Sequence, residues 1–153
     1  MTDLSTNDAR LALVGKWAAK YGLNSYLVCA VIEQESGWNP YVWRFEPGFL
    51  RTYVKPANPD SPTTRELGLS CSFGLMQVMG LVAVELGWQG DILRLTDPDN
   101  AVDFGCRKLQ KCFAVHVEPE TSLLAYNGGG NLLYGEQVLA RVAHYMPQAE
   151  GAD

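Results

Sequence analysis

The stretch "AVIEQESGWNP", residues 30–40, runs from an apolar, helix-like segment into an abrupt stop and carries two glutamates, Glu33 and Glu35. On a helix, side chains two positions apart point about 200° apart around the axis, so the two carboxylates do not share a face. The apolar residues that are spaced three or four positions apart along this helix fall on the same side as Glu35. This pattern predicts Glu35 on the packed side of the helix and Glu33 on the solvated side.

The position of Glu35 predicts a raised pKa. It falls in the last helical turn, where the partial negative charge of the helix end and burial both disfavour the ionised carboxylate. A carboxyl group that stays partly protonated near neutral pH suits general acid catalysis. Taken alone, however, this stretch favours a plainer interpretation, in which Glu35 makes a hydrogen bond or ion pair at a helix end.

Length and composition are those of one globular domain. The 153 residues are 47% hydrophobic, which is enough for one core and leaves little room for a second. The formal net charge of −5 argues against a nucleic-acid partner, because such proteins concentrate Lys and Arg on one surface. No segment reaches the length of a membrane span. The first residues lack the basic region and cleavage site of a secretory signal peptide, so none is expected.

Outward from residues 30–40 the pattern is mostly helical. Gly22 is expected to cap the first helix, and Asn24 or Ser25 to open the second. Asp97-Pro98 and Glu118-Pro119 are typical helix starts. The tail from residue 147 is expected to be loose. The predicted helices cover residues 8–21, 25–36, 73–86, 97–115, 118–127 and 135–145.

Residues 38–70 interrupt this pattern with five prolines and frequent aromatic residues. Periodicity leaves open whether they form short strands or a folded loop. The cysteines Cys29, Cys71, Cys106 and Cys112 have no metal-ligand spacing. Thiols are favoured over a disulfide framework, although a bridge between helices stays open.

Four ordered motifs then identify a resemblance: "ESGWNP" (35–40), "GLMQVM" (74–79), "PDNAVDFGCRKL" (98–109) and "AYNGG" (125–129). Together they resemble the catalytic domain of soluble lytic transglycosylases, of glycoside hydrolase family 23, which is related to goose-type lysozyme. The likeness runs from about residue 25 to about residue 145, so we expect a single domain over 1–153. The implied fold is a mainly α, lysozyme-like α+β domain.

The resemblance implies cleavage of bacterial peptidoglycan between N-acetylmuramic acid and N-acetylglucosamine. It assigns Glu35 as the catalytic acid and then base, with closure of an anhydro-muramyl ring and help from the substrate's acetamido group. A second opposed carboxylate is not required when the substrate assists. No metal or organic cofactor is implied. Besides Glu35, the implied site residues are the helix-stabilising Ser36, the cleft residues Met76 and Gln77, and Tyr126 and Asn127.

Two features qualify this assignment. The family commonly has a proline after the "GLMQVM" run, whereas this chain has Gly80, so the start of the following segment is open. Glu46 is a possible second carboxylate that could direct a water molecule, but an ion pair with Arg44 that shapes the loop is favoured. The aromatic residues of the interruption are candidates for stacking on sugars, although packing is favoured for most: Trp38, Trp43, Phe45 and Tyr53.

Two other functions stay open beside the transglycosylase: a hydrolytic muramidase on the same fold, and a glycan-binding or assembly component without turnover. The expected partner is the peptidoglycan glycan strand, without insertion into a membrane, and the protein is expected to be a monomer. Without a signal peptide, delivery from the cytoplasm to the cell wall is expected through phage release, a virion or a secretion machine.

Overall fold

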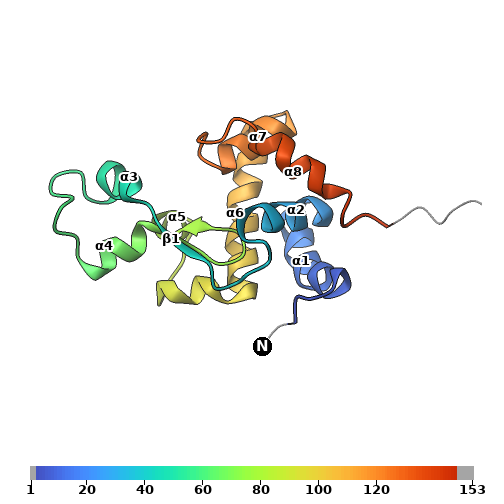
Figure 1. The fold of residues 1–153 in the computed structure, drawn as a ribbon, viewed down its shortest axis with the longest axis horizontal. Helices are drawn as coiled ribbons and strands as arrows, with labels where there is room; N and C mark the ends of the chain where they lie inside the picture. Colours follow the sequence, from blue (N-terminus) through green and yellow to red (C-terminus); the bar gives the residue numbers. More distant parts are fainter. Residues whose placement is uncertain (1–2, 148–153) are drawn as a thin grey trace, which may run out of the picture. The chain divides into compact units, whose positions relative to one another are not determined.

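The computed structural model describes residues 3–147, and the chain forms two compact units (Figure 1). Unit 1 comprises Met1–Gln34 and Leu109–Asp153, and unit 2 comprises Glu35–Lys108. Most of the tail that is expected to be loose, residues 148–153, lies outside the described residues. A single domain over 1–153 stays a prediction.

Unit 1 begins with helix α1 (Asn7–Tyr21), as the sequence predicts. The hydroxyl of Thr6 accepts a hydrogen bond from the Ala9 amide and satisfies one of the unpaired donors of the first turn. The predicted C-terminal cap is confirmed: Gly22 has φ of 65°, and its amide donates back to carbonyls of the last turn.

Helix α2 (Ser25–Ser36) is also confirmed, together with its start. The Asn24 side-chain oxygen accepts from the amides of Tyr26 and Leu27, at 2.9 and 3.1 Å, so Asn24 is the cap. The five consecutive residues 28–32 are fully buried. Such a helix is apolar all round and lies in the core rather than at its edge. Glu33 follows directly after this buried run.

Helices α7 (Pro119–Tyr126) and α8 (Tyr134–Val142) pack on each other in unit 1. The predicted start at Glu118-Pro119 is confirmed, with the proline in the first turn. The packing is close at Gly135, where a Cβ atom would lie 2.8 Å from the Cα atom of Glu120. The last helix is shorter than predicted, since turns replace it after Val142.

Unit 2 contains a three-stranded antiparallel sheet in the order β1-β2-β3, which decides the question left open for residues 38–70. Strand β1 (Trp43–Phe45) pairs with β2 (Cys71–Phe73), with Trp43 opposite Phe73. Strand β2 pairs in turn with β3 (Val78–Met79). The aromatic-rich segment therefore contributes the edge strand of a small sheet.

The predicted helix over residues 73–86 is wrong in its first half. Residues 71–79 form the β2–β3 hairpin, and only α5 (Gly80–Glu85) is helical. Gly74 and Gln77 have φ of 68° and 46°, a left-handed backbone that no α-helix contains. A short apolar run fits a buried strand as well as a helix, so periodicity alone misassigned it. The predicted end at Gly87 is confirmed, with φ of 98°.

The rest of unit 2 is short helical pieces followed by the start of one long helix. Helix α6 (Pro98–Val115) matches its prediction, and the Asp97 carboxylate caps it by accepting from the Asp99 amide at 3.1 Å. The shorter pieces, none of which the sequence pattern located, are α3 (Pro47–Phe49), the π-helix η1 (Leu50–Val54), α4 (Thr64–Leu69) and the 3₁₀-helix η2 (Ile92–Thr96).

The predicted mainly helical α+β class is confirmed by these elements. All four cysteines are in the thiol form. Burial raises the pKa of the Cys29 thiol to about 12, so this thiol is inert at neutral pH.

Within residues 3–147, no helix is long and apolar enough to cross a membrane. The same residues hold no cluster of three or more His, Cys, Asp or Glu that could bind a metal ion.

Candidate active site

Glu35 stands one residue before the end of α2 and is partly buried. The last turn of α2 carries no basic residue to offset the negative end of the helix dipole. Directly afterwards Gly37 and Trp38 both have positive φ, at 56° and 67°. Trp38 is only 6% exposed, so this reversal is held by a buried ring. Trp38 accordingly packs in the core, as is favoured for most of the aromatic candidates.

Ser36 connects the end of α2 to the β2–β3 turn. Its hydroxyl donates a hydrogen bond of 2.9 Å to the carbonyl oxygen of Leu75. The motif that contains Glu35 and the motif that contains Gln77 are thus joined side chain to backbone within unit 2. The bond fits the helix-stabilising role that the resemblance implies for Ser36.

Gln77 uses its amide inside the protein. Its Oε1 accepts from the Ser72 hydroxyl at 2.8 Å, and its Nε2 donates to the carbonyls of Val42 and Gly74, at 3.0 and 2.9 Å. Both Nε2 hydrogens are therefore engaged, and only a further lone pair on Oε1 remains for a ligand. In this structure Gln77 clamps the turn, and a substrate contact through it stays a prediction.

Met76 is fully buried and packs on helix α6. A Cβ atom built on Gly105 would overlap the side chain of Met76, so the glycine lets the two segments approach. The "GLMQVM" and "PDNAVDFGCRKL" motifs therefore meet at this pair. The contribution of Met76 that the structure shows is packing against Gly105, and a contact of Met76 with a sugar stays a prediction.

The close approach of Gly68 explains why residue 80 is a glycine. A Cβ atom at this position would overlap the carbonyl oxygen of Gly68 in α4. A proline ring would need the same space, so α5 begins here on a glycine. The open question about the start of the segment is answered: α5 begins at Gly80 itself.

The Arg44–Glu46 ion pair predicted for the interruption is present, and both side chains are at least one-third exposed. Three of the aromatic candidates are also open to solvent: Trp43 at 65%, Phe45 at 38% and Tyr53 at 65%. The packing expected for most of the aromatic candidates therefore does not hold at these three. A role of Glu46 as a second carboxylate stays a prediction.

Tyr126 and Asn127 belong to unit 1, at the end of α7. Tyr126 is 1% exposed and closes the helix, and Asn127 is its C-terminal cap. The Asn127 side-chain oxygen accepts from the backbone amide of Asn131 at 3.0 Å, across the glycine-rich loop. Gly128 and Gly129 both have positive φ there, which explains the run of glycines.

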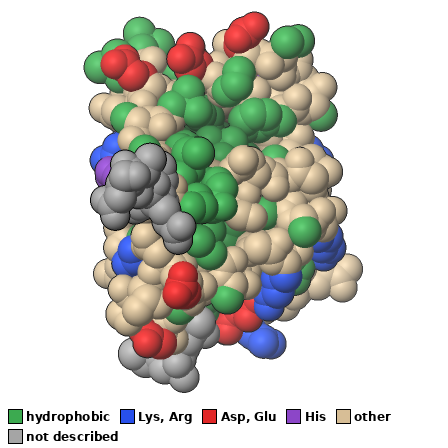
Figure 2. All heavy atoms as spheres, turned by 90° about the vertical axis from the view of Figure 1, so that its right-hand side faces the viewer, with side chains coloured by type: hydrophobic (Ala, Val, Ile, Leu, Met, Phe, Trp, Pro, Cys, Tyr) green, Lys and Arg blue, Asp and Glu red, His purple; other side chains and the backbone are tan. Residues whose placement is uncertain are grey.

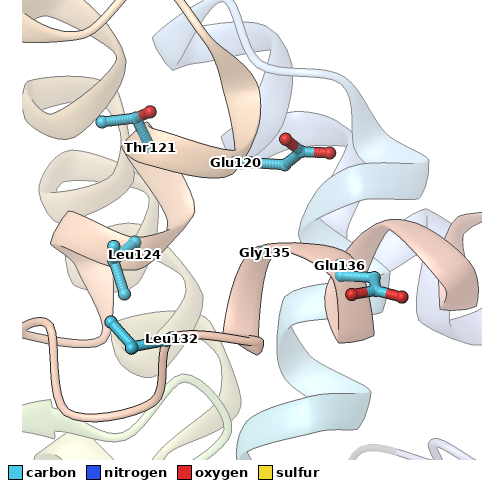
Figure 3. Close-up of a pocket in the computed structure, with 6 residues that line it drawn as sticks. All are labelled: Glu120, Thr121, Leu124, Leu132, Gly135 and Glu136. Atoms are coloured by element: carbon cyan, nitrogen blue, oxygen red, sulfur yellow. The ribbon is translucent and has the colours of Figure 1, made fainter.

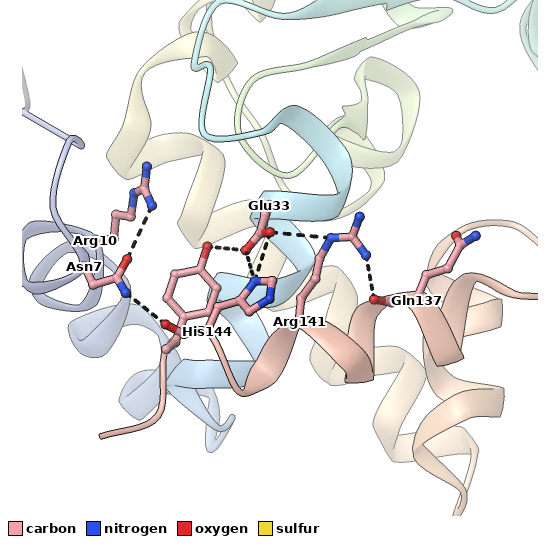
Figure 4. Close-up of polar contacts among 7 residues, drawn as sticks. Asn7, Arg10, Glu33, Gln137, Arg141 and His144 are labelled. Atoms are coloured by element: carbon pink, nitrogen blue, oxygen red, sulfur yellow. Dashed lines mark hydrogen bonds and ion pairs between the residues drawn. The ribbon is translucent and has the colours of Figure 1, made fainter. Parts of the chain in front are cut away.

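Glu33 is not the solvated residue that the helical pattern predicts. Its side chain is 28% exposed, and its carboxylate lies among three side chains from the end of α8 and the turns after it (Figure 4). Tyr145 donates to it at 2.7 Å, His144 Nδ1 lies 3.2 Å from both oxygens, and Arg141 Nε lies 3.7 Å away. Residues more than a hundred positions apart form this cluster, so no local pattern could have indicated it.

Partial burial of Glu33 is the largest influence on its pKa and acts to raise it. The hydrogen bonds from Tyr145 and His144, with the positive charges of His144 and Arg141, together outweigh burial and lower the pKa. Glu33 is thus held as an anion two residues before Glu35. Both glutamates of the opening stretch are half-buried, so the predicted contrast between a solvated Glu33 and a packed Glu35 does not hold for Glu33.

Each unit also has a pocket of its own. In unit 1 a pocket of about 280 Å³ lies between α7 and α8, with Leu124 and Leu132 facing each other and Glu120 and Glu136 on its other side (Figure 3). In unit 2 a pocket of about 320 Å³ lies among α4, α5 and η2, beside Trp88. Hydrophobic side chains gather in a band on the face that Figure 2 shows.

The architecture defines a class: a mainly helical α+β protein of the lysozyme-like type. Comparison with protein families matches residues 12–137 to the Transglycosylase SLT domain. The chain belongs to this family, whose members are of the peptidoglycan lytic transglycosylase type. Searches of curated proteins and of solved structures gave no match. The match includes every residue singled out above for catalysis or substrate binding.

Proposed function

We propose that this protein cleaves the glycan strands of peptidoglycan between N-acetylmuramic acid and N-acetylglucosamine without adding water. Membership of this family, shown by the match over residues 12–137, carries the proposal, and the Glu-Ser pair at residues 35–36 supports Glu35 as the catalytic residue. The position of Glu35 also supports it: the residue is partly buried near the end of a helix whose last turn has no basic residue. Burial and the negative end of a helix dipole both disfavour an ionised carboxylate in general.

In the proposed reaction Glu35 first donates its proton to the glycosidic oxygen as the bond to the leaving sugar breaks. The muramic acid C1 then carries developing positive charge, which the oxygen of the substrate's own acetamido group stabilises. The ionised Glu35 next removes the proton from the C6 hydroxyl, whose oxygen attacks C1 and closes the anhydro ring. Glu35 ends protonated, so one carboxyl group completes the cycle.

The test is mass spectrometry of the soluble products after incubation with purified sacculi. Anhydro-muramyl ends are expected. Reducing muramic acid ends, heavier by one water, would instead show a hydrolase and direct attention to Glu46. Well-folded protein that releases no product would show a glycan-binding or assembly role.

The variant Glu35→Gln separates catalysis from binding. It removes the transferable proton with little change in volume, so turnover should be lost while binding to sacculi is retained. Glu85→Gln, on an exposed residue of α5, is the matched control and should keep full activity. Turnover that survives Glu35→Gln would refute this mechanism. Delivery through phage release, a virion or a secretion machine is likewise proposed, and it rests on the sequence alone.

A further inference from the structure

Four residues with side-chain amides are linked by hydrogen bonds within unit 1, one link being made by a backbone amide, and we call them the amide chain. It begins at Asn127 and continues through Asn131, whose backbone amide donates to Asn127 Oδ1 at 3.0 Å. Asn131 Nδ2 donates to Gln137 Oε1 of α8 at 2.9 Å. Gln34 Nε2 of α2 donates to the same Gln137 oxygen at 3.2 Å. The chain therefore runs from the "AYNGG" motif to the residue before Glu35.

The direction of every amide in this chain is fixed by the backbone. The amides of Asn131 and Leu133 can only donate, so the side-chain atoms that receive them, on Asn127 and Asn131, must be oxygens. Asn131 then donates a hydrogen bond from Nδ2 to Gln137, so the accepting atom of Gln137 must be Oε1. Gln34 in turn must present its Nε2, because two oxygens would otherwise face each other.

One consequence is an unmet acceptor at the far end. Gln34 Oε1 is buried and has no hydrogen-bond partner among residues 3–147. A buried polar atom without a partner is unfavourable. Rotating the Gln34 amide would not relieve this, since it would break the bond to Gln137. The direction of the chain is thus imposed from the Asn131 end and maintained at a cost in α2.

The chain holds a loop that would otherwise be free to vary. Residues 128–130 are three successive glycines, and glycine has access to many more backbone conformations than other residues. Asn131 ends this run with three hydrogen bonds, to Asn127, Leu133 and Gln137. Because Asn127 Oδ1 receives the Asn131 amide, the group that Asn127 offers to a ligand is its Nδ2 donor.

We propose that Asn131 and Gln137 are positioning residues: through the amide chain they hold Asn127 so that its Nδ2 donates to an oxygen of the bound glycan strand. The inference rests on the function proposed above. Neither residue needs to touch the substrate. Their effect on the reaction passes through Asn127, and this makes it separable from a general effect on folding.

The test is a double-mutant cycle on the full chain. Gln137→Met keeps the length of the side chain and removes the acceptor, whereas Gln137→Glu keeps acceptor oxygens for both donors. Rates of product release from sacculi are measured together with the melting temperature. At a temperature where every variant is fully folded, we expect Gln137→Met to lower kcat/KM about tenfold and Gln137→Glu to stay within about threefold of wild type. In the Asn127→Ala background, Gln137→Met should cause no further loss.

The opposite result is equally clear. If Gln137→Met lowers the rate by the same factor with and without Asn127, or does not lower it in either background, the positioning role is refuted. Should Gln137→Met fail to fold, Asn131→Ser gives the same comparison, since it removes the Nδ2 donor while its hydroxyl can still accept.

A second measurement does not depend on activity. Backbone ¹⁵N relaxation of residues 128–131 should report lower order parameters in Gln137→Met than in wild type and Gln137→Glu. Unchanged order parameters would refute the proposal even for a protein without turnover. A wild type that releases no product, or an active Glu35→Gln, would refute the proposed function. Independent effects of Gln137 and Asn127 in an active enzyme would refute the positioning role alone.

Discussion

The hydroxyl of Tyr145, three residues after the end of α8, donates a hydrogen bond of 2.7 Å to the Glu33 carboxylate of α2. Tyr145 is 4% exposed, so this bond lies at the edge of the core of unit 1. The same turn is tied to α1, since Asn7 Nδ2 donates to the His144 carbonyl at 2.9 Å. The segment after α8 therefore binds the helices on which unit 1 is built.

Removing the Tyr145 hydroxyl should weaken unit 1. Tyr145→Phe leaves a partly buried carboxylate short of one donor, so we expect a loss of about 1–2 kcal/mol in the free energy of unfolding. Urea denaturation followed by circular dichroism measures it. Tyr53→Phe is the control, because Tyr53 is 65% exposed and its change should have no measurable effect. Equal stabilities of Tyr145→Phe and wild type would show that the bond contributes nothing net.

The lowered pKa of Glu33 makes part of the stability depend on pH. The folded state favours the anion, so this stabilisation is fully present above the ordinary value of 4.5 and is lost as pH falls through the lower folded pKa. We expect Glu33→Gln to be less stable than wild type at neutral pH by about 1–2 kcal/mol. The difference should shrink towards strongly acidic pH. Glu85→Gln, on an exposed carboxylate, should show no such trend; a difference for Glu33→Gln that is constant with pH would contradict the assignment.

The clamp formed by Gln77 should be important for the stability of unit 2. Gln77→Ala removes three hydrogen bonds and leaves the Ser72 hydroxyl and two carbonyls without their partner, for an expected loss of about 2–4 kcal/mol. Gln89→Ala, an exposed amide, is the control. Thermal and urea unfolding of both variants provide the comparison. A stable Gln77→Ala with impaired glycan binding would instead make Gln77 a substrate contact, as the resemblance implies.

The sequence alone predicted those helix ends that are determined by residues close to them in the chain. The ends of α1, α2, α6 and α7 follow from caps and first-turn prolines within a few residues of each other. It was insufficient for residues 73–79, where a hairpin replaces the predicted helix. The apolar run there has no clear period, and the side-chain bonds of Gln77 hold its left-handed backbone.

The same limit applies to the candidate site. Glu35 could be singled out as a candidate because its motif and its helix end are contiguous in the sequence. The environment of Glu33 depends on Tyr145, and that of Gln34 on Gln137, at separations of 112 and 103 positions. The interpretation of Glu33 as solvated also assumed a one-sided helix, whereas residues 28–32 are buried all round. A contact of this kind becomes visible only in the folded chain.

The close approach of Gly105 to Met76 gives a prediction in which two destabilising changes compensate. Gly105→Ala adds a methyl group that overlaps Met76, for an expected loss of about 1–3 kcal/mol from overpacking. Met76→Ala alone leaves a cavity in a fully buried site, for a loss of about 2–5 kcal/mol. In the double variant the new methyl group occupies part of that cavity, so the combined loss should be clearly smaller than the sum.

Urea denaturation of the four proteins in this cycle measures the coupling. Gly15→Ala is the control for helix propensity, because a Cβ atom there meets nothing within 4 Å. It should stabilise α1 by about 0.5–1 kcal/mol, as expected for an unhindered helical glycine. If Gly105→Ala were stabilising in the same way, the helix at Gly105 would have room for a side chain, and the glycine would not be needed for the contact between the two motifs. If the loss in the double variant equalled the sum of the two single losses, Gly105 would likewise not be needed for the contact with Met76.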